Sequence, residues 1–430
     1  MTLNMNRRQF IISTGAAGIS GILIACQSPA GKTAARNPRR KKIALIGTVV
    51  RKHSHAQHFI DRFLEGYGWA GQWWHPSIDL VSLYIDQFPK EDLARERSKR
   101  FNVPLFPSIE EALAVGKSGL NVDGVIIIGE HGDYKKNHLG QTLYPRYDWF
   151  KKVVGVFESA GRSVPVFNDK HLSTSWPECA EMVADSKRLQ FPFLAGSSLP
   201  VTRRLPAIDF PWGTGLKESL SICYGGVDSY DFHGLETAQC MSERRGGGET
   251  GVRSIQAFQG DSMWTKLFES PERKRLFLAA LSRSHSAAPA DGFTIPTPSE
   301  AWARKVSPKA VGYFIEHLDG LKTTTLTCNG LVQDFTYAGL TVADQIISCQ
   351  MQLPMPTVVS TNADFFNPLV HHIEQMVNTG CAPYPIERTL LTSGMTLFSV
   401  QSLKGEFKKI ETSELKVAYH APKASQFWNV

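Results

Sequence analysis

The sequence predicts an α/β fold, in which an N-terminal Rossmann-type doubly wound parallel sheet is followed by an α+β domain with a largely antiparallel open sheet. Strand-like and helix-like stretches alternate regularly from residue 42 to about residue 200. The run from Val125 to Ile128 is entirely β-branched, as is typical of a strand buried on both faces of a parallel sheet. Beyond that region the strands become longer, and Asp319-Gly320 marks a tight hairpin.

The elements of the first part follow one another in the order that a doubly wound sheet requires. In such a sheet the carboxyl ends of the strands meet at one edge, and open α/β sheets bind their ligands there. Residues that directly follow each strand are therefore the first candidates for chemistry. The expected strands are 42–47, 80–86, 123–129, 163–168 and 193–196, and the expected helices are 55–65, 91–101, 108–115, 144–160 and 178–189.

The second part is predicted as a sheet with helices over one face. Its expected strands are 218–224, 252–259, 311–317, 323–329 and 334–340, and its helices are 233–244, 365–377 and 386–397. His371 and Glu374 are expected to form a solvated pair on the second of these helices. The predicted domain bounds are 42–200 for a dinucleotide-binding domain and 201–430 for an α+β substrate and oligomerisation domain, through which a homo-oligomer would form.

The composition is that of a folded protein whose body is close to neutral. The chain has 430 residues, 42% of them hydrophobic and 20% charged, with ordinary glycine and proline content, which excludes collagen-like and disordered chains. Residues 1–42 hold eight basic and no acidic residues, which leaves 39 basic against 40 acidic residues elsewhere. A nucleic-acid-binding domain is expected to carry a basic face, so no nucleic-acid partner is predicted.

The first 26 residues resemble a twin-arginine export signal that ends in a lipoprotein cleavage site. Arg7 and Arg8 precede an apolar run over 11–25, which is shorter than the ~20 residues that span a bilayer. Cys26 ends a Leu-Ile-Ala-Cys sequence typical of a lipobox, so we expect it to be lipidated, with 27–41 as a flexible tether. The mature protein would be a periplasmic or membrane-anchored lipoprotein.

Polar residues stand where the predicted strands of the first part end. The first strand ends in a glycine and leads through a turn to a helix N-terminus, where the pyrophosphate of a dinucleotide normally docks. The second strand ends in an aspartate, which can accept hydrogen bonds from ribose hydroxyls. Two later strands are followed by charged residues. The candidates at this edge are Gly47, His55, Asp86, Glu130, Asp169 and Lys170.

In this order the motifs resemble those of the glucose-fructose oxidoreductase and inositol dehydrogenase (Gfo/Idh/MocA) family. That family has a glycine-rich turn, a His-Ala pair, an acid closing the second strand, a Glu-Lys-Pro motif and a catalytic histidine in its second domain. The matching positions here are Gly47, His55-Ala56, Asp86, Lys170 and His233. The resemblance covers most of residues 42–400. It implies that NAD or NADP in the first domain exchanges a hydride with a sugar, polyol or sugar derivative.

The chain departs from the family pattern at the cofactor turn. Val49 and Lys52 stand where the family has its second and third glycines, so the backbone cannot approach a pyrophosphate in the usual way. Asp169 and His171 replace the glutamate and proline of Glu-Lys-Pro, and an aromatic insertion begins near Trp69. Free nicotinamide cofactor is scarce outside the cytoplasm, so an exported member would hold its cofactor tightly or return the hydride in the same cycle.

Four residues are predicted to handle the substrate proton. Lys170 can hold or protonate a substrate oxygen at the sheet edge. His233 and Glu236 are three residues apart on a predicted helix, so the carboxylate can lie beside the imidazole, and Asp231 is a second candidate partner. The resemblance implies that His233 relays the proton as hydride leaves the same carbon. The predicted cofactor-binding residues are Gly47, His55, Asp86, Glu130 and Asp169, and no metal ligands are predicted.

Two other functions fit the same residues. His53 and His55 form a His-x-His pair that, with His131, Asp133, His171 and His233, could assemble the metal site of a hydrolase or lyase. Alternatively, the missing glycines fit a carbohydrate-binding lipoprotein without a cofactor. Metal analysis, and a search for nucleotide released on denaturation, separate these alternatives.

Overall fold

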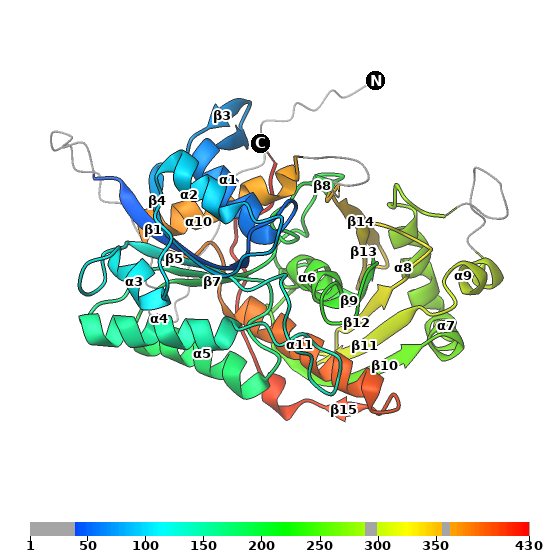
Figure 1. The fold of residues 1–430 in the computed structure, drawn as a ribbon. Coiled ribbons are helices and arrows are strands. Elements are labelled where there is room, and N and C mark those ends of the chain that lie inside the picture. Colours follow the sequence, from blue (N-terminus) through cyan, green and yellow to red (C-terminus); the bar gives the residue numbers. More distant parts are fainter. Residues whose placement is uncertain (1–38, 289–298, 355–361, 430) are drawn as a thin grey trace, which may run out of the picture. The chain divides into compact units, whose positions relative to one another are not determined.

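Two large sheets organise the chain, and helices pack against both of them (Figure 1). The structure is a computed structural model that describes residues 39–288, 299–354 and 362–429. The strands are β1 (Lys41–Val49), β2 (Tyr67–Trp69), β3 (Gln72–Trp74), β4 (Ile78–Gln87), β5 (Gly124–Ile128), β6 (Val166–Asp169), β7 (Phe193–Gly196), β8 (Arg204–Leu205), β9 (Leu216–Cys223), β10 (Val252–Gln259), β11 (Val311–His317), β12 (Lys322–Thr327), β13 (Phe335–Thr341), β14 (Ile346–Met351) and β15 (Ile410–Glu411). The helices are α1 (His55–Glu65), α2 (Ala94–Phe101), α3 (Ile109–Ala114), α4 (Arg146–Ala160), α5 (Trp176–Arg188), α6 (Asp231–Ser242), α7 (Asp261–Phe268), α8 (Pro271–Leu281), α9 (Glu300–Val306), α10 (Asn367–Thr379) and α11 (Glu387–Lys404), with the 3-10 helices η1 (Asp364–Phe366) and η2 (Ser413–Leu415).

The first sheet is parallel throughout, with the strand order β4-β1-β5-β6-β7. β5 is buried along its whole length, as its β-branched sequence predicts. One face of the sheet packs against α3, α4 and α5, and the other packs against α1 and α10. The predicted Rossmann-type doubly wound sheet is therefore confirmed, and the carboxyl ends of its strands meet at one edge.

The second sheet has the order β15-β10-β11-β12-β9-β13-β14-β8, and only the β12-β9 pair is parallel. On one face Ser221 of β9 donates a hydrogen bond to the backbone oxygen of Gly234 in α6. On the other face Leu220 and Ile222 of β9 pack with residues of α7 and α8. The predicted α+β domain with a largely antiparallel sheet is confirmed, although α7, α8 and α9 are not among the expected elements.

The prediction that α10 covers the second sheet is wrong, because α10 packs beside α1 on the first sheet. Leu369 and Ile373 of α10 share a hydrophobic core with Phe59 of α1. Gly124 at the start of β5 makes room for the helix, since a Cβ there would lie 2.8 Å from Val377 Cγ2. The apolar pattern of α10 marks a buried face but does not specify which sheet buries it.

The aromatic insertion forms the hairpin β2-β3, which packs on α10. The ring of Trp69 stacks on His371 with 4.2 Å between ring centroids. Glu374 is buried and accepts hydrogen bonds from Trp74 Nε1 at 2.9 Å and from Ser77 Oγ at 2.7 Å. The prediction of a solvated pair is therefore wrong, because the insertion covers both side chains.

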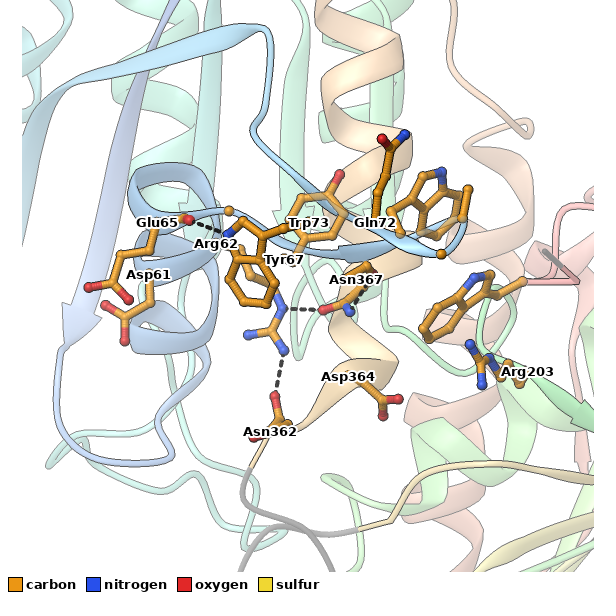
Figure 2. Close-up of a pocket in the computed structure, with 16 residues that line it drawn as sticks. Asp61, Arg62, Glu65, Tyr67, Gln72, Trp73, Arg203, Asn362, Asp364 and Asn367 are labelled. Atoms are coloured by element: carbon orange, nitrogen blue, oxygen red, sulfur yellow. Dashed lines mark hydrogen bonds between the residues drawn. The ribbon is translucent and has the colours of Figure 1, made fainter.

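A cavity of about 690 Å³ lies next to this hairpin (Figure 2). The Arg62 guanidinium borders it and donates to Asn367 Oδ1 and to the backbone oxygen of Asn362, both at 2.7 Å. Trp73 is 63% exposed and donates its indole N–H to the backbone oxygen of Glu65. The residues predicted for chemistry do not line this cavity, which lies apart from the edge described next.

None of the described helices is long and apolar enough to cross a bilayer. The predicted export signal, including Cys26, lies outside the described residues, as does most of the predicted tether.

Candidate active site

A second, smaller cavity of about 160 Å³ opens at the carboxyl edge of the first sheet. It brings together five predicted residues, which are His55, Glu130, Asp169, Lys170 and His233. Lys170 and His233 therefore open onto one cavity, although one follows β6 and the other belongs to α6. The remaining lining residues are His53, His58, His131, Ser197, Ser198, Leu199, Tyr230, Phe335, Leu353, Phe365 and Phe366.

His55 is fixed by a helix start and by a buried carboxylate. Ser54 caps α1, and its Oγ accepts a hydrogen bond from the backbone N–H of Gln57. His55 Nδ1 then lies 2.7 Å from Asp169 Oδ2. Asp169 is fully buried, and its Oδ1 has no hydrogen-bond partner among the described residues. A buried polar atom without a partner is unusual, and a bound molecule could reach this oxygen only after a shift of the side chains that cover it.

Lys170 is a buried cation with a fixed counter-charge. Its Nζ lies 3.4 Å from Glu130 Oε1, and Arg146 Nη2 donates to Glu130 Oε2 at 2.7 Å. Burial would raise the pKa of Glu130, but Lys170 and Arg146 outweigh it and hold this pKa well below its usual range. Two cations thus share one carboxylate, so this side of the cavity can stabilise negative charge on a bound oxygen.

His233 is buried and is joined to Glu236 through a serine. Ser197, which directly follows β7, lies with its Oγ 3.0 Å from His233 Nδ1, and it donates a hydrogen bond to Glu236 Oε2. Gly196 permits this approach, because a Cβ there would lie 2.6 Å from Glu236 Oε1. Burial, together with the charge of Lys170, lowers the pKa of His233 well below its usual value, so the imidazole is neutral. Burial also raises the pKa of Glu236 to about 7.

Three residues that line the cavity have a left-handed backbone conformation. The φ angles are 64° at His53, 68° at His131 and 66° at Lys170. This region is uncommon for residues other than glycine, asparagine, aspartate and histidine, so the strain falls chiefly on Lys170, and such strain clusters at functional sites. His131 is also largely buried, which lowers its pKa to about 3, and its Nε2 has no hydrogen-bond partner among the described residues. These features indicate a cavity wall adapted to a bound molecule.

The other predicted residues lie away from the cavity. Asp231 is fully buried in the second domain, where it accepts hydrogen bonds from Tyr313 and from Thr327 Oγ1. Burial raises the pKa of Asp231 to about 6. Gly47 lies within β1, and a Cβ there would stand 3.1 Å from Ile85 Cδ1, so this glycine serves close packing. These positions argue against contact of either residue with a molecule in the cavity.

At the outer part of the edge, a segment that follows β5 crosses to β4. Gln87 Oε1 accepts from the backbone N–H of Asp133 at 2.9 Å, and Gln87 Nε2 donates to the backbone oxygen of Asp133 at 3.0 Å. Tyr134 donates to Asp86 Oδ2 at 2.6 Å. Since β1 lies between β4 and β5, residues 131–134 span the edge beyond β1, and we call them the edge strap.

The two unusual residues of the predicted cofactor turn do not line the cavity. Val49 is 2% exposed and pairs with Gln87 as the last residue of β1. Lys52 is exposed. Neither residue therefore fills the small cavity in place of a ligand.

Sequence reasoning missed several residues of the site. Ser197 directly follows a predicted strand, so the rule that selected Asp169 and Lys170 would also have found it. Phe366 stacks on His58 with 4.8 Å between ring centroids, and no local signal could place it there because it is about 300 residues away in the chain. No group of three or more His, Cys, Asp or Glu residues within the described ranges is arranged to hold a metal ion.

Comparisons with known proteins place this arrangement in a known fold. No protein-family model matches the chain, and no curated protein sequence matches it. The structure resembles GenD2 from gentamicin A biosynthesis in complex with NAD, with 11% identity over 90% of this chain and 99% of that one, and a TM-score of 0.53. It also resembles myo-inositol dehydrogenase from Lactobacillus casei in complex with NAD(H) and myo-inositol, with 10% identity, coverage of 86% and 96%, and a TM-score of 0.55. A third similar structure is myo-inositol 2-dehydrogenase from Lactobacillus plantarum, with 9% identity, coverage of 87% of this chain and 99% of that one, and a TM-score of 0.51. The chain thus shares the fold of these dehydrogenases.

Proposed function

We propose that this protein is an exported NAD(P)-dependent oxidoreductase that acts on a sugar, a polyol or a sugar derivative. The observation that carries the proposal is the convergence of Lys170 and His233 on one cavity at the carboxyl edge of a Rossmann-type sheet. A buried cation and a neutral imidazole at one cavity are the groups needed to hold a hydroxyl oxygen and remove its proton. The resemblance to NAD-bound GenD2 and myo-inositol dehydrogenase supports the same reaction class.

Lys170 and His233 would have different roles toward the substrate hydroxyl. Lys170 Nζ would donate a hydrogen bond to the oxygen and stabilise the negative charge that develops as the proton leaves. His233, which stays neutral in its buried position, would accept that proton. Asp169 and His131 line the same cavity, and Asp169 Oδ1 and His131 Nε2 have no hydrogen-bond partner among the described residues. Both atoms are buried, so a neighbouring substrate hydroxyl would reach them only after a shift of these side chains. NAD(P), when bound, would supply the acceptor for the hydride that leaves the carbon bearing this hydroxyl.

The residues present fit the reactive end of a dinucleotide better than its adenosine end. The cavity beside Lys170 and His233 can take one ring, and at about 160 Å³ it is smaller than the roughly 300–1,000 Å³ usual for larger ligands, so it must widen to hold a substrate ring and a nicotinamide ring together. Asp86, the predicted ribose acceptor, is occupied by Tyr134 of the edge strap. A dinucleotide lying across β1 therefore requires the edge strap to separate from Gln87.

The first test asks whether the purified protein contains bound NAD(P) or another small molecule. The purified protein is denatured, and released small molecules are examined by mass and by absorbance. NAD(P) is then titrated into the native protein by calorimetry. Released or rebound NAD(P) supports the proposal, whereas recovery of none together with no binding contradicts it.

The edge strap favours one second candidate, a carbohydrate-binding lipoprotein without a cofactor. Three hydrogen bonds hold the strap to Asp86 and Gln87, and this closed edge is compatible with a small ligand alone. In that case sugars or polyols would bind to the protein with no nucleotide present. Calorimetric titration with such ligands, with and without NAD(P), distinguishes the two functions.

We further propose that the protein reaches the periplasm by the twin-arginine pathway and is anchored through lipid on Cys26. The supporting observation is the order of Arg7-Arg8, an apolar run and Cys26 in the sequence. Replacing both arginines by lysine should keep the protein in the cytoplasm. Cys26→Ser should release the exported protein from the membrane and abolish palmitate labelling, and membrane retention of this variant would contradict the anchor.

A further inference from the structure

A chain of hydrogen bonds leads from the cavity into the interior through His233, Ser197 and Glu236. Ser197 Oγ stands between the other two side chains, 3.0 Å from His233 Nδ1 and in hydrogen-bond contact with Glu236 Oε2. The backbone N–H of Ser197 donates to Glu236 Oε1 at 3.0 Å, which fixes the carboxylate. The serine is therefore held in a position to exchange its proton with either neighbour.

The directions of these hydrogen bonds set the tautomer of His233. While Glu236 is ionised it can only accept, so the Ser197 hydroxyl donates to it and the Ser197 oxygen accepts from the ring. The imidazole proton then lies on Nδ1. The hydrogen bond of His233 to Ser197 uses Nδ1, and His233 lines the cavity, so Nε2 is left as the proton acceptor.

A positive charge on this imidazole would be costly. His233 is 8% exposed, and its charged neighbour Lys170 lines the same cavity. Removal of a buried group from water disfavours the imidazolium, and a nearby cation disfavours it further. A proton that enters at Nε2 must therefore be matched by one that leaves at Nδ1.

We propose that Ser197 and Glu236 form a proton relay behind His233. As Nε2 takes up a proton, the Nδ1 proton passes to Ser197 Oγ, and the Ser197 hydroxyl proton passes to Glu236 Oε2. Glu236 ends as a carboxylic acid, Ser197 is restored, and His233 stays neutral with its proton on Nε2. No electrons are exchanged, and the reverse movement resets the site.

The surroundings of both ends are compatible with this movement. Burial raises the pKa of Glu236 to about 7, so the carboxyl group can hold or release a proton near neutral pH. Arg388 of α11 and Lys170 are the cations that act on Glu236, and Arg388 is already bound by Glu243. The charged or titratable groups that act on His233 are Lys170, His55, Glu130 and His171.

The relay rests on the proposed function only for the source of its proton, and the tautomer change can be measured without substrate or cofactor. Histidine labelled with ¹⁵N in the purified protein reports the tautomer by NMR, and the His233 signal is the one missing from His233→Gln. We expect the proton on Nδ1 at pH 9, where Glu236 is ionised. At pH 5.5 Glu236 is protonated and donates to Ser197, so we expect the His233 proton on Nε2.

Variants test each step of the chain. Glu236→Gln keeps the shape of the side chain but cannot gain or lose a proton, so the switch of tautomer should disappear. Ser197→Ala interrupts the chain and should have the same result. Ser402→Ala removes a buried serine hydroxyl that bonds the backbone of Ala257 and Lys408, and it should keep the switch.

The outcomes separate the relay from the proposed function. One tautomer of wild-type His233 at both pH values, an imidazolium at pH 5.5, or a switch that persists in Glu236→Gln would overturn the relay. If Ser197→Ala fails to fold, Glu236→Gln alone decides. If the tautomer of His233 switches but the protein binds no NAD(P), the relay is supported and the proposed oxidoreductase function is contradicted. If the protein shows NAD(P)-dependent turnover but no tautomer switch, the proposed function is supported and the relay is contradicted.

Discussion

The carboxyl edge of the first sheet has an inner half, beside β6 and β7, and an outer half, beside β1 and β4, and the two halves differ in the groups that a ligand could contact. Beside β6, β7 and α6, buried groups such as Lys170 and His233 surround a cavity and leave nearby polar atoms without partners. Beside β1 and β4, the edge strap satisfies Asp86 and Gln87 with its own hydrogen bonds. The half that holds the groups proposed to handle the proton therefore contains a cavity, whereas the half that would take adenosine is occupied by the chain itself. The two halves can be tested separately.

The largest effect is expected at the inner half, from removal of the proposed general base. His233→Gln should lower kcat by about 10²–10⁴-fold, which is the usual contribution of a positioned acid or base. Turnover is measured with NAD(P) and a panel of sugars and polyols. His285→Gln replaces an exposed histidine and should leave kcat unchanged. Equal turnover in the two variants would remove His233 from the chemistry.

The next effect concerns the buried charges that hold Lys170. Glu130→Gln leaves Lys170 and Arg146 buried without their shared carboxylate, so the free energy of unfolding should fall by about 3–5 kcal/mol. Urea unfolding at pH 7 measures this change. Glu181→Gln breaks an exposed ion pair with Lys151 and should leave the free energy of unfolding nearly unchanged. Similar losses in both variants would show that Glu130 does not balance buried charge.

Much of this inner half could be predicted because local rules apply there. Strand periodicity located β5 and β6, and the rule that ligands bind at carboxyl ends selected Glu130, Asp169 and Lys170. His233 came from a family resemblance, and the helical spacing correctly placed Glu236 near it. These predictions needed only neighbouring residues or the regular geometry of one element.

The failures arose where contacts between distant segments decide the result. Asp231 is an exception, because helical spacing alone separates it from His233 by about 200° around α6 and could have shown that the two residues face opposite ways. No local pattern indicates that α10 returns to the first sheet or that Phe366 reaches His58. The edge strap likewise depends on pairing between Gln87 and Asp133, 46 residues apart. Such contacts require the tertiary structure.

A smaller effect tests the outer half directly. Gln87→Ala removes two hydrogen bonds of the edge strap, each worth about 0.5–1.5 kcal/mol. If NAD(P) must displace the strap, its affinity should rise by roughly tenfold in this variant, as measured by calorimetry. Gln72→Ala, on the exposed hairpin, serves as the control and should bind like wild type. Weaker binding to Gln87→Ala would instead mean that the strap supports the cofactor.

A further effect is expected in the pH dependence of stability, in which the contributions of buried acids and bases have opposite signs in the wild-type protein. Burial raises the pKa of Glu236 from 4.5 to about 7, so its contribution to stability is present at low pH and is lost as pH rises through this interval. Burial lowers the pKa of His131 from 6.5 to about 3, so its contribution is lost as pH falls through that interval. Glu236→Gln removes only the first contribution. The difference in unfolding free energy, wild type minus variant, should therefore decrease from pH 4.5 to 7 and be constant above about pH 8. Urea unfolding across this range measures it. A difference that does not vary with pH would show that folding does not raise the pKa of Glu236, which would make Glu236 a poor proton acceptor behind His233 near neutral pH.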